Sequence, residues 1–555
     1  MSQWNQRDDK VLLGIAVIAI LIITCFPFLK DGIGGYEPDL LYHLLRVEGV
    51  KNAILQGDYP TAIYTNFFDG YGYGSPLFYP DILLVIPALL RVFGCNIELS
   101  WKLFVCIIVI VASLSTYFSF CYILKDSRYA ILAMCMLMLS QFYLADLQVR
   151  VGLSEYFAYI FLPIWAAGIY DFFAAKGKKI WLLGVGFTGM LLTHTIMTFL
   201  GGVITVIIFA IALLTKSGRE VLRDKGRWRR LILTGVCSFG VSAYYLFPML
   251  EQMLNAQYRY TVAFQKVGNF MQPFSSFFRL TGYFDYIAYV GIGWPLLALL
   301  VTRVIYRHSK NTIGDCFLFG GLLLFLVTTP IIPWRLFNET ILNSIQFTYR
   351  FYPYALCFLV LGIAFILRDH WQEKKFLFYS TLAVVMFFGV IQNASVLKYE
   401  FHTNLSEEYV QSKCNSVGSG EWLPEPMDED VEELKADGKV LYNGQEIDFI
   451  TDKEYVGTFV SQGIGKYIVP RIYYKGYHAY SIDENGKRIE YDLEKSENGL
   501  LSIFINKDNY TVYVEYEKTP IGKVSEIVSL LTVIVLLGFF CRYRNIWNTH
   551  LLCTL

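Results

Sequence analysis

Apolar residues are grouped along this chain into runs of roughly 18 residues or more, the length that a helix needs to cross a hydrocarbon core. Polar residues lie mostly between these runs. The pattern predicts a polytopic α-helical membrane protein, and the first run, which lacks a small-residue cleavage site, is expected to be an anchor. Twelve runs are predicted to span the membrane: about 11–29, 99–123, 128–144, 156–175, 180–198, 200–215, 231–250, 286–306, 315–333, 352–368, 376–393 and 521–541.

One further apolar run, 81–94, is shorter and contains Arg91. If this run crossed the bilayer, the loop 216–230, which carries seven Lys and Arg residues, would face outward. Cytoplasmic loops are normally the basic ones, so the positive-inside rule favours a run that does not cross. Both termini are then expected in the cytoplasm, and loop 30–98 with its juxtamembrane helices is expected outside.

The region 394–520 has a different composition from the rest of the chain. Its segments alternate or are rich in β-branched and aromatic residues, and turns such as "DENG" and "SENG" separate them. We predict an extracytoplasmic β-sandwich-like domain here. The predicted organisation is a transmembrane domain over 1–393, this β domain, and a final helix with a cytoplasmic tail over 521–555.

Four tyrosines of the β domain allow two interpretations. Tyr473, Tyr474, Tyr477 and Tyr480 could stack on sugar rings, or they could form the domain core and its contacts with neighbouring loops. Neighbouring residues on a strand point to opposite faces, so one core cannot bury all four.

Composition excludes several other classes of protein. The 555 residues are 55% apolar, the mean hydropathy is +0.42 and the formal net charge is zero, so no nucleic-acid partner is expected. Most of the eleven cysteines lie in apolar runs, which is ordinary usage of buried thiols and not a disulfide framework. The sequence contains no Walker A, Gly-x-Ser-x-Gly or His-Glu-x-x-His motif.

Candidate chemistry begins in "YEPDLLYHLLRVEG", just after the first apolar run. At helical spacing Asp39, His43 and Arg46 share one face. The carboxylate could act as a general base or bind a divalent cation, Mg²⁺ or Mn²⁺, and the imidazole could relay a proton. Alternatively, the helix is a juxtamembrane amphipathic helix whose polar face meets water. The glycine-rich and proline-bearing loops on both sides of this helix favour a functional site over a solvated helix face.

Three further places carry ionisable residues at predicted span ends. Arg150 and Glu155 lie in "VRVGLSE": Glu155 could face Asp39 while Arg150 holds a phosphate, or Glu155 could simply favour a helix N-terminus. His194 is either a site residue or a hydrogen-bonded packing histidine. Arg350 suits a lipid phosphate, from either an ordinary headgroup or a lipid-linked substrate.

Several motifs together resemble a known group of proteins. They are "PDLLYHLLRVEGVKNAILQGDYP", "GYGYGSPLFYPDILL", "LQVRVGLSEYFAYIFLPIW", "LLTHTIMTFL", "VSAYYLFPML" and "IQFTYRFYPYAL", followed by the strands "IYYKGYHAY" and "YTVYVEYEKTP". Their order resembles the bacterial 6-pyruvoyl-tetrahydropterin-synthase-related membrane proteins, which are YfhO-like, within the GT-C class of membrane glycosyltransferases. The resemblance implies a GT-C-like fold of about twelve transmembrane helices.

The same resemblance implies a function and site residues. A GT-C enzyme of this kind would transfer a sugar from a polyprenyl-phosphate donor to a cell-envelope glycan or glycolipid at the outer face of the bacterial plasma membrane. Asp39 matches the catalytic acid of the first loop, with Glu37 as the competing carboxylate and Glu155 as a second acidic residue. The expected substrate-binding residues are His43, Arg46, Tyr79, Arg150, His194 and Arg350. The alternative function is a non-catalytic transporter, flippase or scaffold for lipid-linked saccharides.

Overall fold

The structure is a computed structural model, and it divides the chain into two compact units. One unit contains Met1–Lys51, Asp81–Leu231 and Gln265–Lys413, and the other contains Asn52–Pro80, Ile232–Phe264 and Cys414–Leu555. The residues that the structure describes are 6–29, 32–33, 37–262, 265–278, 291–308, 310–371, 374–396, 406–413, 420–427, 438–453, 456–507 and 510–551.

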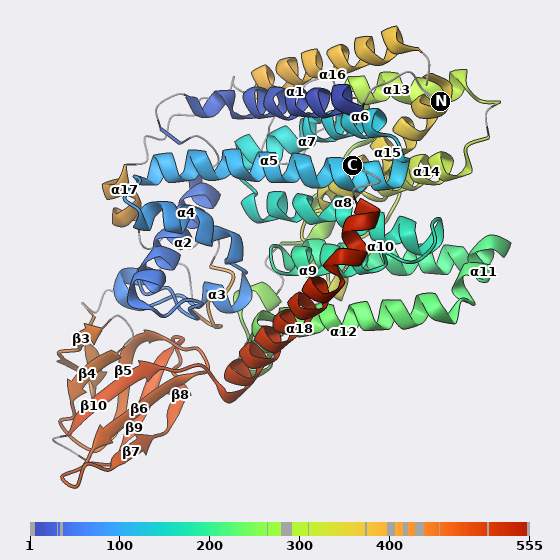
Figure 1. Ribbon diagram of the computed structural model, residues 1–555. Helices are drawn as coiled ribbons and strands as arrows, with labels where there is room; N and C mark the ends of the chain where they lie inside the picture. Colours follow the sequence, from blue (N-terminus) through green and yellow to red (C-terminus); the bar gives the residue numbers. More distant parts are fainter. Residues whose placement is uncertain are drawn as a thin grey trace. The chain divides into compact units, whose positions relative to one another are not determined.

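Most of the chain is helical (Figure 1), and each of the twelve runs predicted to span contains a helix. The helices that coincide with these runs are α1 (Gln6–Cys25), α5 (Ile97–Leu124), α6 (Ser127–Met138) with α7 (Gln141–Ala145), α8 (Leu153–Phe173), α9 (Trp181–Leu191), α10 (Thr195–Leu214), α12 (Lys225–Asn255), α13 (Trp294–Ile305), α14 (Thr312–Val327), α15 (Tyr352–Trp371), α16 (Lys375–Val396) and α18 (Pro520–Leu551). Shorter or more polar helices are α2 (Glu37–Gln56), α3 (Ser75–Phe78), α4 (Val85–Val92), α11 (Lys216–Leu222) and α17 (Glu407–Ser412).

Within the described residues, seven helices are long and apolar enough to cross a membrane. An eighth candidate is the pair Ser127–Met138 and Gln141–Arg150, which is bent by 48°. This set indicates a multi-pass membrane protein, and the number of twelve spans stays a prediction. Helix α4, in the short run 81–94, has eight residues and is about 12 Å long. A helix of that length falls well short of the core thickness of about 30 Å, but the predicted spans α9 and α13 are similarly short, so whether the run 81–94 crosses stays a prediction.

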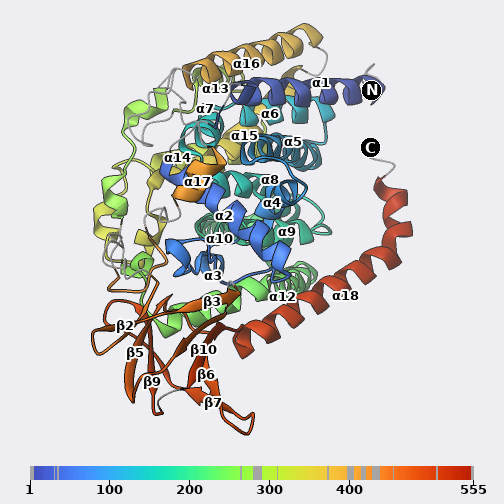
Figure 2. The same ribbon diagram turned by 90° about the vertical axis from the view of Figure 1, so that its left-hand side faces the viewer.

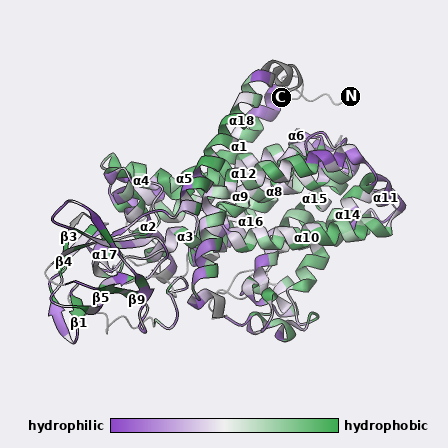
Figure 3. Cartoon of the chain, turned by 90° about the horizontal axis from the view of Figure 1, so that it is seen from below, coloured by the Kyte–Doolittle hydropathy of each residue, from purple (hydrophilic) through white to green (hydrophobic). Residues whose placement is uncertain are grey.

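Burial separates the inner helices of the bundle from the outer ones. The apolar window of α15 is 100% buried and that of α8 is 78% buried, whereas only 28% of the α10 window is buried. Helices α1, α5, α6 and α16 lie side by side (Figures 1 and 2). Hydrophobic positions cover α10 and α14, and hydrophilic ones cover α11 (Figure 3). Exposed apolar helix faces of this kind suit contact with lipid.

Helices α8 and α9 cross closely because each contributes glycine to the crossing. A Cβ atom at Gly168 would overlap the backbone nitrogen of Leu183 on α9. In the other direction, a Cβ atom at Gly186 would lie 2.6 Å from the Cα of Trp165 on α8. Small residues let helix backbones approach in this way, which is how membrane helices gain packing contacts.

This crossing leads to a prediction about stability. Gly168→Ala is expected to destabilise the bundle by roughly 1–3 kcal/mol, because the added methyl group meets backbone that cannot move aside. The measurement is the thermal unfolding midpoint of the purified protein in detergent. Gly202→Ala on α10 is the matched control, since nothing lies within 4 Å of its Cβ position and alanine favours a helix. Equal midpoints for the two variants would contradict the close crossing.

The second unit contains a C-terminal β-sheet domain of two five-stranded antiparallel sheets. Phe459 and Tyr467, one from each sheet, pack together with ring centroids 5.4 Å apart. The first sheet has the order β2 (Gln445–Ile447), β1 (Val440–Tyr442), β5 (Gly465–Ile472), β9 (Leu500–Ile505), β8 (Leu493–Lys495). The second has the order β3 (Ile450–Lys453), β4 (Val456–Val460), β10 (Thr511–Tyr516), β6 (Tyr477–Ile482), β7 (Arg488–Tyr491).

The four tyrosines of the β domain divide between its interior and its surface. Tyr474 and Tyr477 are buried, while Tyr473 and Tyr480 are half-buried. The Tyr474 ring lies over the ring of Tyr258, which belongs to the same unit, with centroids 6.2 Å apart. Half of this group therefore serves packing.

Candidate functional site

The candidate site lies in the first unit, where a turn leads into helix α8. Helix α7 continues into a five-residue π-helix, Asp146–Arg150, which ends at Val151 with φ of 53°. Gly152 follows, and a Cβ atom there would lie 2.6 Å from Oδ1 of Asp146. A side chain at this position would have to displace the carboxylate of Asp146, which accepts from Arg150 and Tyr159. The turn brings Arg150 back towards Glu155 in the first turn of α8.

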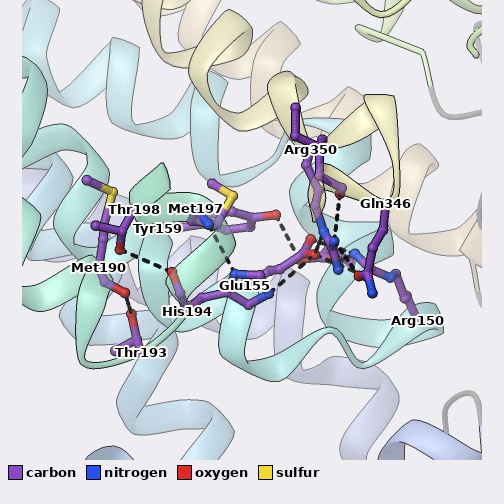
Figure 4. A network of polar contacts seen from close by, with 12 residues as sticks. Arg150, Glu155, Tyr159, Met190, Thr193, His194, Met197, Thr198, Gln346 and Arg350 are labelled. Carbon is purple, nitrogen blue, oxygen red and sulfur yellow. Dashed lines mark hydrogen bonds and ion pairs between the residues drawn. The ribbon is translucent and has the colours of Figure 1, made fainter. Parts of the chain in front are cut away.

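Glu155 is the centre of a buried ionic network (Figure 4). Arg150 donates to both carboxylate oxygens, from Nη1 to Oε2 at 2.6 Å and from Nη2 to Oε1 at 3.1 Å. Arg350, in the short 3-10 helix Thr348–Phe351 that leads into α15, donates from Nε to Oε1 at 2.5 Å. Both arginines and Glu155 are at least nine-tenths buried. One carboxylate thus fixes two guanidinium groups whose positions are 200 residues apart in the sequence.

His194 approaches the same carboxylate from the beginning of α10. Its Nδ1 accepts the backbone N–H of Met197 at 3.2 Å and so caps the helix. The hydrogen of a neutral ring is then on Nε2, which lies 3.6 Å from Oε1 of Glu155. His194 is therefore a hydrogen-bonded helix cap that also lies beside the ionic network. Its role as a site residue stays a prediction.

Asp146 and Tyr159 also belong to the network, although neither was among the predicted site residues. Asp146 accepts from Nη1 of Arg150 at 3.1 Å and from the hydroxyl of Tyr159 at 2.8 Å. The available signal was the spacing of Asp146 and Arg150, since opposite charges four residues apart meet on one helical face. Arg150 consequently lies between two carboxylates.

Helix α2 carries the second group of candidate residues. Asp39, His43 and Arg46 share one face as predicted, and Nη1 of Arg46 lies 3.4 Å from Nδ1 of His43. His43 and Arg46 are buried and Asp39 is half-buried. Away from this face, Glu48 of α2 is fixed by Arg91 of α4, with Nε of Arg91 2.6 Å from Oε1. That buried ion pair holds α2 against α4.

The charges of the ionic network act on Asp39 of α2. Burial raises the pKa of Asp39 to about 6; the positive charges of Arg150 and Arg350 oppose this rise and the negative charge of Glu155 adds to it. For His43, burial holds the pKa well below its usual range, and Arg46, His194 and Arg150 lower it further. Near neutral pH the site therefore combines a carboxyl group that can gain or lose a proton with a neutral imidazole.

The two remaining predicted site residues are Glu37 and Tyr79. Glu37 is the first residue of α2, but its side chain lies outside the described part of the structure. Tyr79 follows α3 in the second unit, where it is half-buried. The first unit brings together the other predicted site residues: Asp39, His43, Arg46, Arg150, Glu155, His194 and Arg350.

The geometry of the network limits what each residue can do chemically. Glu155 already accepts three hydrogen bonds from arginines, so it orients cations and is poorly placed to take a proton. Arg150 Nε is buried and has no hydrogen-bond partner among the described residues. An unpaired donor of this kind costs about 1–3 kcal/mol, which favours an acceptor atom of a ligand beside it. No group of three or more His, Cys, Asp or Glu side chains suited to a metal ion occurs in the described part of the chain.

One protein sequence and two solved structures are similar to this chain. An uncharacterized protein of Lactococcus lactis subsp. cremoris (strain MG1363) is 21% identical over an alignment of 587 positions, and the alignment covers 94% of each chain. Two crystal structures of the Archaeoglobus fulgidus oligosaccharyltransferase, one with Zn and sulfate and one in the apo form, are similar with a TM-score of 0.38 each. Their identities are 14% and 12%, and the matches cover 69% and 80% of this chain.

This chain spans only 53% and 59% of the lengths of those two oligosaccharyltransferase chains. A TM-score of 0.38 is too low to support an assignment of fold or function, and the YfhO-like resemblance stays a prediction. A family described as "Family of unknown function (DUF6541)" matches residues 2–337. Because residues 2–337 are more than half of the 555 residues, this chain belongs to the DUF6541 family.

Proposed function

We propose that this protein is a membrane glycosyltransferase that transfers a sugar from a polyprenyl-phosphate donor to an extracytoplasmic glycan or glycolipid acceptor. The observation that supports the proposal most is the position of Asp39, a carboxyl group with a pKa of about 6, under the influence of two buried arginines. A general base works best when its pKa lies near the operating pH, and arginines are well suited to phosphate. The motifs that resemble GT-C enzymes agree with this proposal.

The depth of the ionic network suits a lipid-linked phosphate. Glu155, His194 and Arg350 lie within the first residues, or directly before the first residue, of three helices that could span the membrane. A polyprenyl-phosphate sugar has its phosphate at this boundary, with its prenyl chain among the helices. Helix N-termini also carry partial positive charge, which favours an anion there. The unpaired Nε of Arg150 is the donor that we assign to a phosphate oxygen.

The proposed reaction is a direct displacement with inversion at the anomeric carbon. Asp39 takes the proton of an acceptor hydroxyl as that oxygen forms a bond to the anomeric carbon. The bond from this carbon to the phosphate oxygen breaks, and the electron pair leaves with the polyprenyl phosphate. Arg150 and Arg350, both held by Glu155, stabilise the charge that develops on the leaving phosphate.

The direct test separates transfer from transport. Purified protein in liposomes is given a donor with a radiolabelled sugar, together with a cell-envelope acceptor extract. The enzyme is expected to move the label from lipid to acceptor, leaving unlabelled polyprenyl phosphate. A flippase would instead carry intact labelled lipid across the bilayer, and a scaffold would bind the lipid without either change. Either of those results would contradict the proposal.

The pH dependence of transfer provides a second prediction. The carboxyl group of Asp39 is protonated, and unable to accept a proton, below its pKa of about 6. The value of kcat/KM is therefore expected to rise with pH through a midpoint near 6 and to level off above pH 7. Initial rates between pH 4.5 and 8 at subsaturating donor measure this. A midpoint near 4, the usual value for an aspartate in water, would show that the base is a different or more exposed group.

A further inference from the structure

A second cluster of charged residues lies at the opposite end of α8 from Glu155. Helices α5 and α8 pack side by side and end there, at Leu124 and Phe173. The hydroxyl of Tyr122 donates to Oδ1 of the buried Asp171 at 2.5 Å, and the backbone N–H of Lys179 donates to Oδ2 at 2.7 Å. Both oxygens of this carboxylate are thus used by a hydroxyl and a backbone amide.

Two ammonium groups lie near the ring of Tyr122. Nζ of Lys125 is 3.7 Å from the ring centroid and Nζ of Lys179 is 4.5 Å from it, so the two nitrogens are at most about 8 Å apart. Neither ammonium group has an ion pair within 4 Å in the part of the chain that the structure describes. A cation gains energy over a tyrosine ring, but two like charges at this separation repel each other. An anion that contacts both would remove the repulsion.

We propose that Lys125 and Lys179 form a binding site for the phosphate of an anionic phospholipid, with Tyr122 as its floor. Lys125 directly follows the apolar helix α5, which puts it at the height of lipid headgroups. Trp181 begins α9 beside Lys179 and is 40% exposed, as expected for a tryptophan at a membrane interface. The positive-inside rule predicts that this end is cytoplasmic, where anionic lipids attract basic residues. The site is independent of the proposed transfer reaction.

Native mass spectrometry of the full chain in detergent tests the site by titration with phosphatidylglycerol or phosphatidylcholine. The double variant Lys125→Gln/Lys179→Gln is expected to weaken phosphatidylglycerol binding by roughly tenfold to thirtyfold, because each lysine near a surface contributes about 1 kcal/mol. Lys176→Gln/Lys178→Gln is the control, since these exposed lysines neighbour the cluster and remove the same charge. We expect less than a threefold change in the control and weak phosphatidylcholine binding throughout.

Three outcomes would overturn the proposal. Equal losses in both double variants would indicate diffuse attraction to a basic surface. Equal binding of the two lipids by the unmodified protein would show that the charge is not recognised. Displacement of the lipid by millimolar glycerol phosphate would assign the site to a soluble anion. If the double variant does not fold, Lys179→Gln alone, at an exposed position, is expected to weaken phosphatidylglycerol binding by roughly threefold to tenfold.

Discussion

Replacing Asp39 by asparagine is expected to lower kcat for sugar transfer by about 10²- to 10⁴-fold, the usual contribution of a general base. The amide has nearly the same size as the carboxyl group but cannot accept the proton of the acceptor hydroxyl. In the proposed mechanism the arginines hold the donor, so the Kd for the donor is expected to change by less than about threefold. Rates with radiolabelled donor and binding by fluorescence quenching measure the two quantities separately.

The matched control for Asp39→Asn is Glu408→Gln, the same acid-to-amide change at an exposed position on α17. It is expected to retain both transfer and donor binding. Full transfer activity in Asp39→Asn would rule out Asp39 as the base and direct attention to Glu37. Loss of donor binding together with activity would instead place Asp39 among the groups that hold the donor.

Replacing Glu155 by glutamine is expected to destabilise the protein by about 3–5 kcal/mol. Glu155 is 2% exposed and compensates two buried arginines, so the substitution leaves Arg150 and Arg350 without their shared counter-charge. Arg150 keeps its contact with Asp146, but Arg350 keeps no other carboxylate among the described residues. A lower midpoint of thermal unfolding in detergent, with weaker donor binding in the protein that remains folded, is the expected result.

Glu98→Gln provides the comparison for Glu155→Gln because it breaks a different kind of ion pair. Glu98 contacts Lys102 at 2.5 Å, but its side chain is 33% exposed. A partly exposed pair is screened by water and contributes about 0–1 kcal/mol, and the amide oxygen can still accept the N–H of Gly32, so this variant is expected to unfold close to the unmodified protein. Similar small effects for both variants would mean that water reaches Glu155 and that the ionic network is not buried.

Local sequence patterns were sufficient for the elements of this protein. Each run predicted to span contains a helix, and seven of the described helices, or eight with the bent pair, are long and apolar enough to cross a membrane, where only a helix satisfies the backbone of such a run. The β domain followed from alternation between turn residues, since a strand exposes successive side chains on opposite faces. Asp39, His43 and Arg46 were placed on one face by helical spacing alone. These features depend on neighbours a few residues away, which the sequence displays directly.

Other features depend on contacts between distant segments. The bend of 48° falls between Met138 and Gln141, inside what hydropathy presents as one apolar run, because the break changes direction without changing composition. The sequence predicted that Glu155 and Arg350 lie near the same membrane face, yet their direct contact joins residues 195 positions apart.

By itself, then, the sequence determined which segments are helices or strands and which face of α2 is polar. Only the tertiary structure decided that Glu155 is shared by two arginines, that Asp146 supports one of them, and that burial raises the pKa of Asp39 to about 6. The physical reason is that secondary structure follows from local periodicity, whereas burial and charge pairing are set by whichever distant helices pack together.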